Sequence, residues 1–165
     1  MPRVAVHPRH GLVLGGLGGL VLGGAASGLI GGAAMALLAL LLVSTAGESA
    51  WRPIEAVASF FLGSRAMTAP VSAGTIAVGL LLHAVAAAVL GVIFATLFAE
   101  FPTEVLIPVG ILYGLAVWLL VRFVVIPTTD LALAGPPAAL IAEHVVFGAC
   151  LWLFLPIRQA IERRS

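Results

Sequence analysis

The sequence predicts an all-α fold, a bundle of four membrane-spanning helices with a short amphipathic interfacial helix between the first and second spans. Three observations lead to this prediction. Hydrophobic residues make up 62% of the 165-residue chain and charged residues only 9%, which is far outside the range of soluble globular domains. Four apolar runs with very few charges each reach the roughly 20 residues that cross a bilayer. Short polar or proline-containing stretches separate these runs.

The charge pattern argues against several functions. The formal net charge is +1, and all eight basic residues are arginines spread along the chain. A nucleic-acid partner is therefore not expected, since phosphate binding needs a basic patch. The lone Cys150 excludes an intrachain disulfide. No phosphate-binding glycine loop, nucleophile elbow or CxxC motif occurs. We expect a protein that is not an enzyme and that holds no metal.

The first span is predicted over residues 19–43, because no charged residue occurs between Gly11 and Gly47. Glycines recur in this region with a four-residue step, at Gly15, Gly19 and Gly23 and again at Gly24, Gly28 and Gly32. Such a step keeps small residues on one helical face and lets another helix approach closely in lipid. The main interpretation is an internal helix contact, and the alternative is a homodimer seam.

A short interfacial helix is predicted over residues 51–63. Ser49 can cap it, Pro53 suits its first turn and Gly63 can end it. Helical periodicity predicts an apolar face of Ile54, Val57, Ala58 and Phe61 opposite a polar side of Arg52, Glu55 and Ser59. Trp51 is expected at headgroup depth. Whether the helix lies flat or re-enters the bilayer stays open.

The other three spans are predicted over residues 72–99, 105–127 and 137–156. His83 interrupts the second, Arg122 the third, and Glu143 and His144 the fourth. Small residues suited to helix packing occur in the last two spans, at Gly110, Gly114 and Gly148. The tryptophans are expected to anchor the helices or to fill packing gaps.

Counting basic residues predicts the orientation. An even number of spans places both tails on one side of the membrane. The tails carry five arginines, Arg3, Arg9, Arg158, Arg163 and Arg164, and the opposite side carries Arg52, Arg65 and Arg122. This bias predicts cytoplasmic termini in a bacterial inner membrane, with the interfacial helix facing outward.

Intramembrane ionisable residues are costly and need partners, so His83, Arg122, Glu143 and His144 form the candidate polar cluster. Glu143 and His144 follow the start of the fourth span by about six residues, or about 9 Å. Arg122 lies at a similar depth in the third span. We therefore expect Arg122 to pair with Glu143 directly or through water, since an unpaired buried charge is expensive. Asp130 and Arg65 are reserve partners.

Three interpretations of the histidines stay open. His83 and His144 can hydrogen-bond hydroxyl or carbonyl groups and fix helix register, which is the structural interpretation. They can ligate a b-type haem from two helices, although no spacing is specific for it. They can also form a metal or proton-relay site with Glu143.

Several short motifs resemble small, uncharacterised bacterial four-helix membrane proteins of unknown function. They are Gly31-Gly32 through Met35, Trp51-Arg52-Pro53 followed by Gly63, His83, Leu112-Tyr113-Gly114-Leu115, and His144-Val145-Val146-Phe147-Gly148. The resemblance spans residues 29–155. It implies a fold and a membrane location and no particular reaction.

Three functions follow as hypotheses. The first is a non-catalytic accessory or assembly subunit that contacts other membrane subunits, or a second copy, through its small-residue faces. The second is a small transporter or channel for a proton, ion or anion that uses the polar cluster. The third is a haem- or quinone-binding redox subunit.

Overall fold

The computed structural model describes residues 10–128 and 136–164, with side chains from residue 16 onward. Every regular element in these ranges is helical. In chain order they are α1 (His10–Thr45), α2 (Arg52–Leu62), α3 (Arg65–Thr68), α4 (Ala73–Phe98), α5 (Thr103–Leu120), the π-helical turn η1 (Val121–Val125), α6 (Ile126–Thr128), α7 (Pro137–Cys150), the 3₁₀ turn η2 (Leu151–Leu153) and α8 (Phe154–Glu162). The all-α prediction is confirmed.

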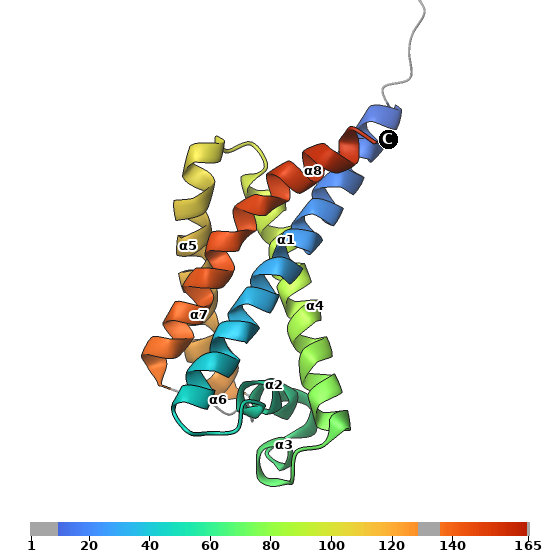
Figure 1. The fold of residues 1–165 in the computed structure, drawn as a ribbon. Helices are drawn as coiled ribbons and strands as arrows, with labels where there is room; N and C mark the ends of the chain where they lie inside the picture. Colours follow the sequence, from blue (N-terminus) through green and yellow to red (C-terminus); the bar gives the residue numbers. More distant parts are fainter. Residues whose placement is uncertain (1–9, 129–135, 165) are drawn as a thin grey trace, which may run out of the picture.

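Four stretches are long and apolar enough to cross a membrane, and they identify a multi-pass membrane protein: Gly16–Thr45, Ala73–Phe98, Thr103–Thr128 and Pro137–Glu162. The fourth continues past its predicted end because η2 and α8 prolong α7. The start of α1 and the end of α8 lie at one end of the bundle, here called the C-terminal end (Figure 1). The opposite end carries α2 and α3 and is called the α2 end.

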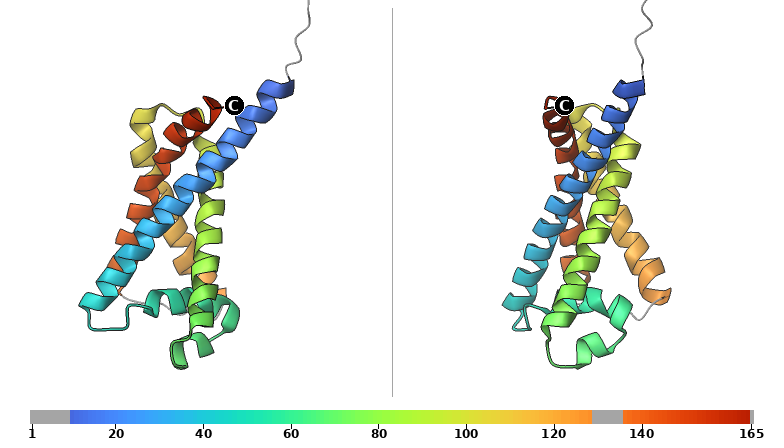
Figure 2. Two further views of the ribbon diagram at one scale, coloured as in Figure 1. Left: turned by 45° about the vertical axis from the view of Figure 1, so that its right-hand side comes forward. Right: turned by 90° about the vertical axis from the view of Figure 1, so that its right-hand side faces the viewer.

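Helix α1 crosses the middle of the bundle and packs against α4, α7 and α8 (Figures 1 and 2). Its glycines permit this contact. A methyl group at Gly24 would lie 2.8 Å from the carbonyl oxygen of Gly91, and one at Gly91 would lie 2.7 Å from the Cα atom of Gly28. Only hydrogen atoms fit between these backbones, so the small residues set the approach of α1 to α4.

Glycines also bring α5 and α7 into close contact. Gly110 and Gly148 face each other across this contact, and Gly114 faces the backbone carbonyl of His144. The contact therefore fixes where the His144 side chain leaves α7. Helices α4 and α5, in contrast, contact each other little, although a short loop connects them.

The remaining glycines of α1 also face other helices of the chain. Gly19 faces the side chains of Glu162 and Arg158, Gly23 faces the backbone of Phe154, and Gly32 faces Ala87 and His83. Gly15 belongs to α1, but its surroundings lie outside the described side chains. Gly19, Gly23, Gly28 and Gly32 of the predicted series thus lie against other helices of the same chain.

An aromatic core occupies the half of the bundle nearest the C-terminal end. Phe94 and Phe154 are fully buried there with Leu106 and Leu151. The Phe94 ring meets the Phe154 ring edge-on, with 6.0 Å between centroids, and it meets Phe98 at 4.9 Å. Rings at these separations attract each other beyond the apolar area that they bury.

Helix α2 corrects the sequence prediction. It begins at Arg52 and ends before Gly63, whose φ of 68° suits glycine. Burial does not follow the predicted division into faces. Ile54 and Ala58 of the apolar face are buried, but so are Glu55 and Ser59 of the polar side, whereas Phe61 is 74% exposed. Ile54 packs on Gly79 of α4.

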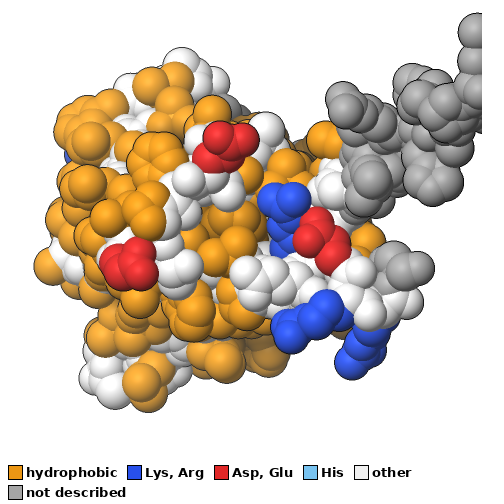
Figure 3. Space-filling model, turned by 90° about the horizontal axis from the view of Figure 1, so that it is seen from above, with side chains coloured by type: hydrophobic (Ala, Val, Ile, Leu, Met, Phe, Trp, Pro, Cys, Tyr) orange, Lys and Arg blue, Asp and Glu red, His pale blue; other side chains and the backbone are white. Residues whose placement is uncertain are grey.

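Charged side chains are sparse even at the C-terminal end, where the surface between them is hydrophobic (Figure 3). Arg158 and Glu162 of α8 form an ion pair with 2.7 Å between Nε and Oε1. Arg163 and Arg164 are exposed beside them. The arginines Arg3 and Arg9 that entered the charge count lie outside the described residues, as does Asp130.

Candidate functional site

A cavity of about 530 Å³ lies in the half of the bundle near the α2 end. All four spans and α2 contribute to its wall. Most of the wall is apolar, with Met35 and Ala36 from α1, Val57 from α2 and Leu90 from α4 among its residues. The four residues of the predicted polar cluster also line it. The cavity therefore combines a large apolar space with a small polar region.

The mouth of the cavity lies along α4. Val85 and Val89 line the cavity and are 53% and 52% exposed, and Ala86 between them is also exposed. Phe60 of α2 lines the cavity too and is half exposed. At this end α4 and the end of the third span diverge (Figure 2, right). The exposed side of the cavity therefore lies beside α4, within a stretch that is long and apolar enough to cross a membrane.

The two histidines reach the cavity from different helices and are fixed by backbone carbonyls. Nε2 of His83 lies 2.9 Å from the carbonyl oxygen of Gly32, which joins α4 to α1. Nδ1 of His144 lies 2.7 Å from the carbonyl oxygen of Leu140, one turn earlier in α7. Both rings thus make the kind of backbone hydrogen bond that the structural interpretation predicts. Each ring retains a second nitrogen.

The predicted direct pairing of Arg122 with Glu143 is not formed. Both residues line the cavity, and Glu143 is 4% exposed. Within residues 16–128 and 136–164 the ion pairs are Arg52–Glu48 and Arg158–Glu162, and neither involves the cluster. The guanidinium of Arg122 instead lies over the ring of Phe123, 5.5 Å from its centroid. The reserve partner Arg65 is exposed on α3 and does not line the cavity.

Arg122 departs from its predicted direction because the helix changes pitch where it occurs. Residues 121–125 form the π-helical turn η1 between α5 and α6. A π turn holds an additional residue, so the side chains that follow rotate relative to α5. Such turns are frequent at functional sites. Val121, Arg122 and Val125 of η1 all line the cavity.

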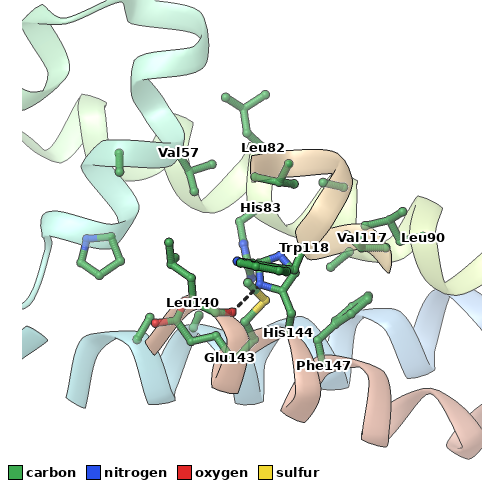
Figure 4. A pocket seen from close by; sticks show the side chains of 18 of the residues that line it. Val57, Leu82, His83, Leu90, Val117, Trp118, Leu140, Glu143, His144 and Phe147 are labelled. Carbon is green, nitrogen blue, oxygen red and sulfur yellow. Dashed lines mark hydrogen bonds between the residues drawn. The ribbon is translucent and has the colours of Figure 1, made fainter. Parts of the chain in front are cut away.

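Trp118 contributes a polar atom that the sequence analysis did not assign to the site. Its Nε1 atom is the buried side-chain nitrogen or oxygen that has no hydrogen-bond partner in the described part of the chain. The indole lines the same cavity as His83, Glu143 and His144, and in Figure 4 it projects onto the same part of the wall as the two histidine rings. A buried N–H without an acceptor is costly and calls for an explanation. Trp118 Nε1 is therefore a hydrogen-bond donor available to a molecule in the cavity.

The described residues hold no group of three or more His, Cys, Asp or Glu side chains arranged to bind a metal ion. The metal hypothesis thus has no preformed ligand set in these ranges. The free nitrogens of His83 and His144 are the atoms that an axial haem ligand would use. Each ring is, however, already oriented by its carbonyl bond, toward the apolar cavity.

Comparison with known proteins adds the family. The model of a family of unknown function, DUF6789, matches residues 18–163. The chain belongs to this family. No curated protein and no solved structure matches the chain. The DUF6789 match covers all four spans and the cavity, and it confirms the resemblance to an uncharacterised family.

Sequence reasoning found the four polar residues of this DUF6789 protein but missed the cavity and Trp118. An apolar cavity wall and a lipid-facing surface use the same residue types, so hydropathy does not separate them. One signal was present in the sequence. Trp118 lies four residues before Arg122, on the same helical face, and so belongs with the polar cluster by periodicity.

Proposed function

We propose that this protein is a non-catalytic membrane protein that binds a lipid-soluble molecule within the bilayer. The cavity of about 530 Å³ carries the proposal. Its volume falls in the range of small-molecule sites, roughly 300–1,000 Å³, and such sites are largely apolar with a few polar groups that orient the ligand. Here His83, Trp118 and Glu143 are polar groups of that kind.

The position of the mouth favours a ligand that arrives from lipid. Val85, Ala86 and Val89 border the cavity on the exposed side of α4. A water-soluble ligand would meet an apolar rim at this place. A molecule with an apolar tail can partition into the bilayer and enter between α4 and α5 without leaving it.

An accessory role in a bacterial inner membrane is compatible with this proposal. The accessory hypothesis relied on free glycine faces, but Gly24, Gly28 and Gly91 pack inside the chain. A larger partner would therefore contact the exposed leucines and valines instead. The basic-residue rule favours a cytoplasmic position for the C-terminal end, which carries Arg158, Arg163 and Arg164.

Trp118 offers a direct test of occupancy. A variant that carries W51F and W152F leaves Trp118 as the sole tryptophan. In phosphatidylcholine nanodiscs, a brominated alkyl chain added at low mole fraction should quench its fluorescence, because bromine atoms in the cavity would lie near the indole. The quenching should saturate at about one probe per protein.

Two alanines of α4 supply the matched pair of variants. Ala86 lines the cavity mouth, and Ala77 is exposed on the same helix away from the cavity. In the Trp118-only background A86F should abolish the saturable quenching, and A77F should leave it unchanged. Quenching that rises linearly with probe and responds equally to both substitutions would show simple lipid contact and would refute the proposal.

A further inference from the structure

The hydrogen bonds at the polar region of the cavity define the head group of the ligand. A carbonyl oxygen can only accept a hydrogen bond, so Nε2 of His83 donates to Gly32 and Nδ1 of His144 donates to Leu140. In a neutral imidazole the other nitrogen is then an acceptor. His83 Nδ1 and His144 Nε2 are therefore acceptor atoms of this site.

Trp118 supplies the complementary group. Its Nε1–H can only donate, and it has no acceptor in the described part of the chain. All three rings line the cavity, and in Figure 4 they project onto the same part of its wall. A ligand that satisfies all three rings has to donate two hydrogen bonds and accept one. A head group with acceptors alone would satisfy Trp118 and leave both histidines unmatched.

The formal charges around the cavity favour a head group without net charge. Arg122 and Glu143 carry opposite formal charges and both line the wall. A phosphate head group normally meets several basic side chains or backbone N–H groups. Among the described residues of the wall Arg122 is the one arginine, and a carboxyl group shares the space with it. An anionic lipid head group is thus disfavoured.

We infer that the cavity binds a hydroquinone carrying an apolar tail, in preference to the corresponding quinone; this inference rests on the proposed function. The two hydroxyl groups of a hydroquinone each donate one hydrogen bond and also accept, which matches His83, His144 and Trp118. A quinone has two carbonyl oxygens and no donor. The aromatic ring stacks on the indole, and the tail leaves through the mouth beside Val85 and Val89. Binding involves no electron transfer.

Three probes of nearly equal shape separate the steps of this inference. They are 2-decylhydroquinone, kept reduced, 2-decylbenzoquinone, and the dimethyl ether of the hydroquinone, which accepts but does not donate. Each is equilibrated with protein-containing and empty nanodiscs, and the excess retained by the protein gives its dissociation constant. The hydroquinone should bind about two- to tenfold more tightly than the quinone or the ether for each donor bond that these lack.

Two variants assign the bonds. H144F should lower the hydroquinone's advantage over its ether by about two- to tenfold, since one of the two acceptors is lost. W118F should weaken all three probes alike, because each has an oxygen that accepts from the indole. Equal affinity for the hydroquinone and the ether, or tighter binding of the quinone, would overturn the inference.

Failure of this inference is distinguishable from failure of the proposed function. If the brominated chain saturates the site and A86F blocks it, the cavity is a binding site whatever the head group. In that case equal affinities for the three probes refute the hydroquinone assignment alone. If the brominated chain does not saturate, both proposals fall together.

Discussion

The two halves of the bundle are built from the same residue types but pack differently. Near the C-terminal end, Phe94, Leu106 and Phe154 are fully buried in one aromatic and aliphatic cluster. Near the α2 end, equally apolar side chains such as Val85 and Phe60 surround a cavity and are half exposed. Composition therefore does not decide which half is closed.

The difference follows from helix geometry. Glycines hold α1 against α4 and α5 against α7, whereas α4 and α5 make few contacts and diverge toward the α2 end (Figure 2). In water such a gap would collapse to hide apolar surface. In a membrane the neighbouring lipid is as apolar as the wall, so little drives closure. A lipid-facing cavity can thus persist at small cost.

The largest expected loss of stability comes from a substitution in the tightly packed half near the C-terminal end. Phe94→Ala should lower the free energy of unfolding by about 3–5 kcal/mol, because it opens a void among fully buried rings. Phe60→Ala removes the same atoms from the cavity wall, where the side chain is already half exposed, and should cost well under half as much. Titration with SDS in mixed micelles measures both. Equal losses would contradict the contrast between the halves.

A smaller effect is expected where α1 crosses α4, between the two halves. Gly28→Leu should destabilise the protein by about 1–3 kcal/mol or more, since even a methyl group there would strike the backbone at Ala87 and Gly91. Gly18→Leu is the control on the same helix, as nothing lies within 4 Å of its added carbon. Unfolding of both variants by SDS titration provides the comparison. A stable Gly28→Leu variant would show that the two helices are not in close contact.

The smallest effect concerns the polar wall of the open half. His83→Leu removes the bond to the Gly32 carbonyl and should cost about 0.6 kcal/mol, the average for interhelical hydrogen bonds in membranes. Thr96→Val on the same helix loses only a bond to Val92, within α4, and should change stability less. A loss of several kcal/mol for His83→Leu would mean that this histidine holds the helices together. In that case its role is structural, and the ligand assignment weakens.

Much of this architecture follows from patterns that a sequence displays directly. Long uncharged runs predict the spans, and the glycines with a four-residue step lie where α1 meets its neighbours, Gly19 and Gly23 at α8 and Gly28 and Gly32 at α4. Counting residues from the span ends also brought Arg122, Glu143 and His144 to one depth. The structure places all three at one cavity. These features depend on length and periodicity, which the chain carries locally.

The features that escaped prediction depend on geometry between helices. Residues 121–125 form a π turn in which Arg122 lies over the ring of Phe123. No residue type in this stretch predicts such a turn. Amphipathic periodicity also did not predict which side chains of α2 are buried, since Glu55 and Ser59 are buried while Phe61 is exposed. The cavity arises from the divergence of α4 and α5, a property of neither helix alone.

The packing of α1 against α8 joins two helices that are far apart in the sequence. Gly19 and Gly23 of the first helix are covered by Arg158 and Glu162 of the last, and Gly31 is covered by Phe147 and Cys150. During synthesis these glycines enter the membrane long before their cover exists. This flank of α1 can therefore be covered only after α7 and α8 have been made.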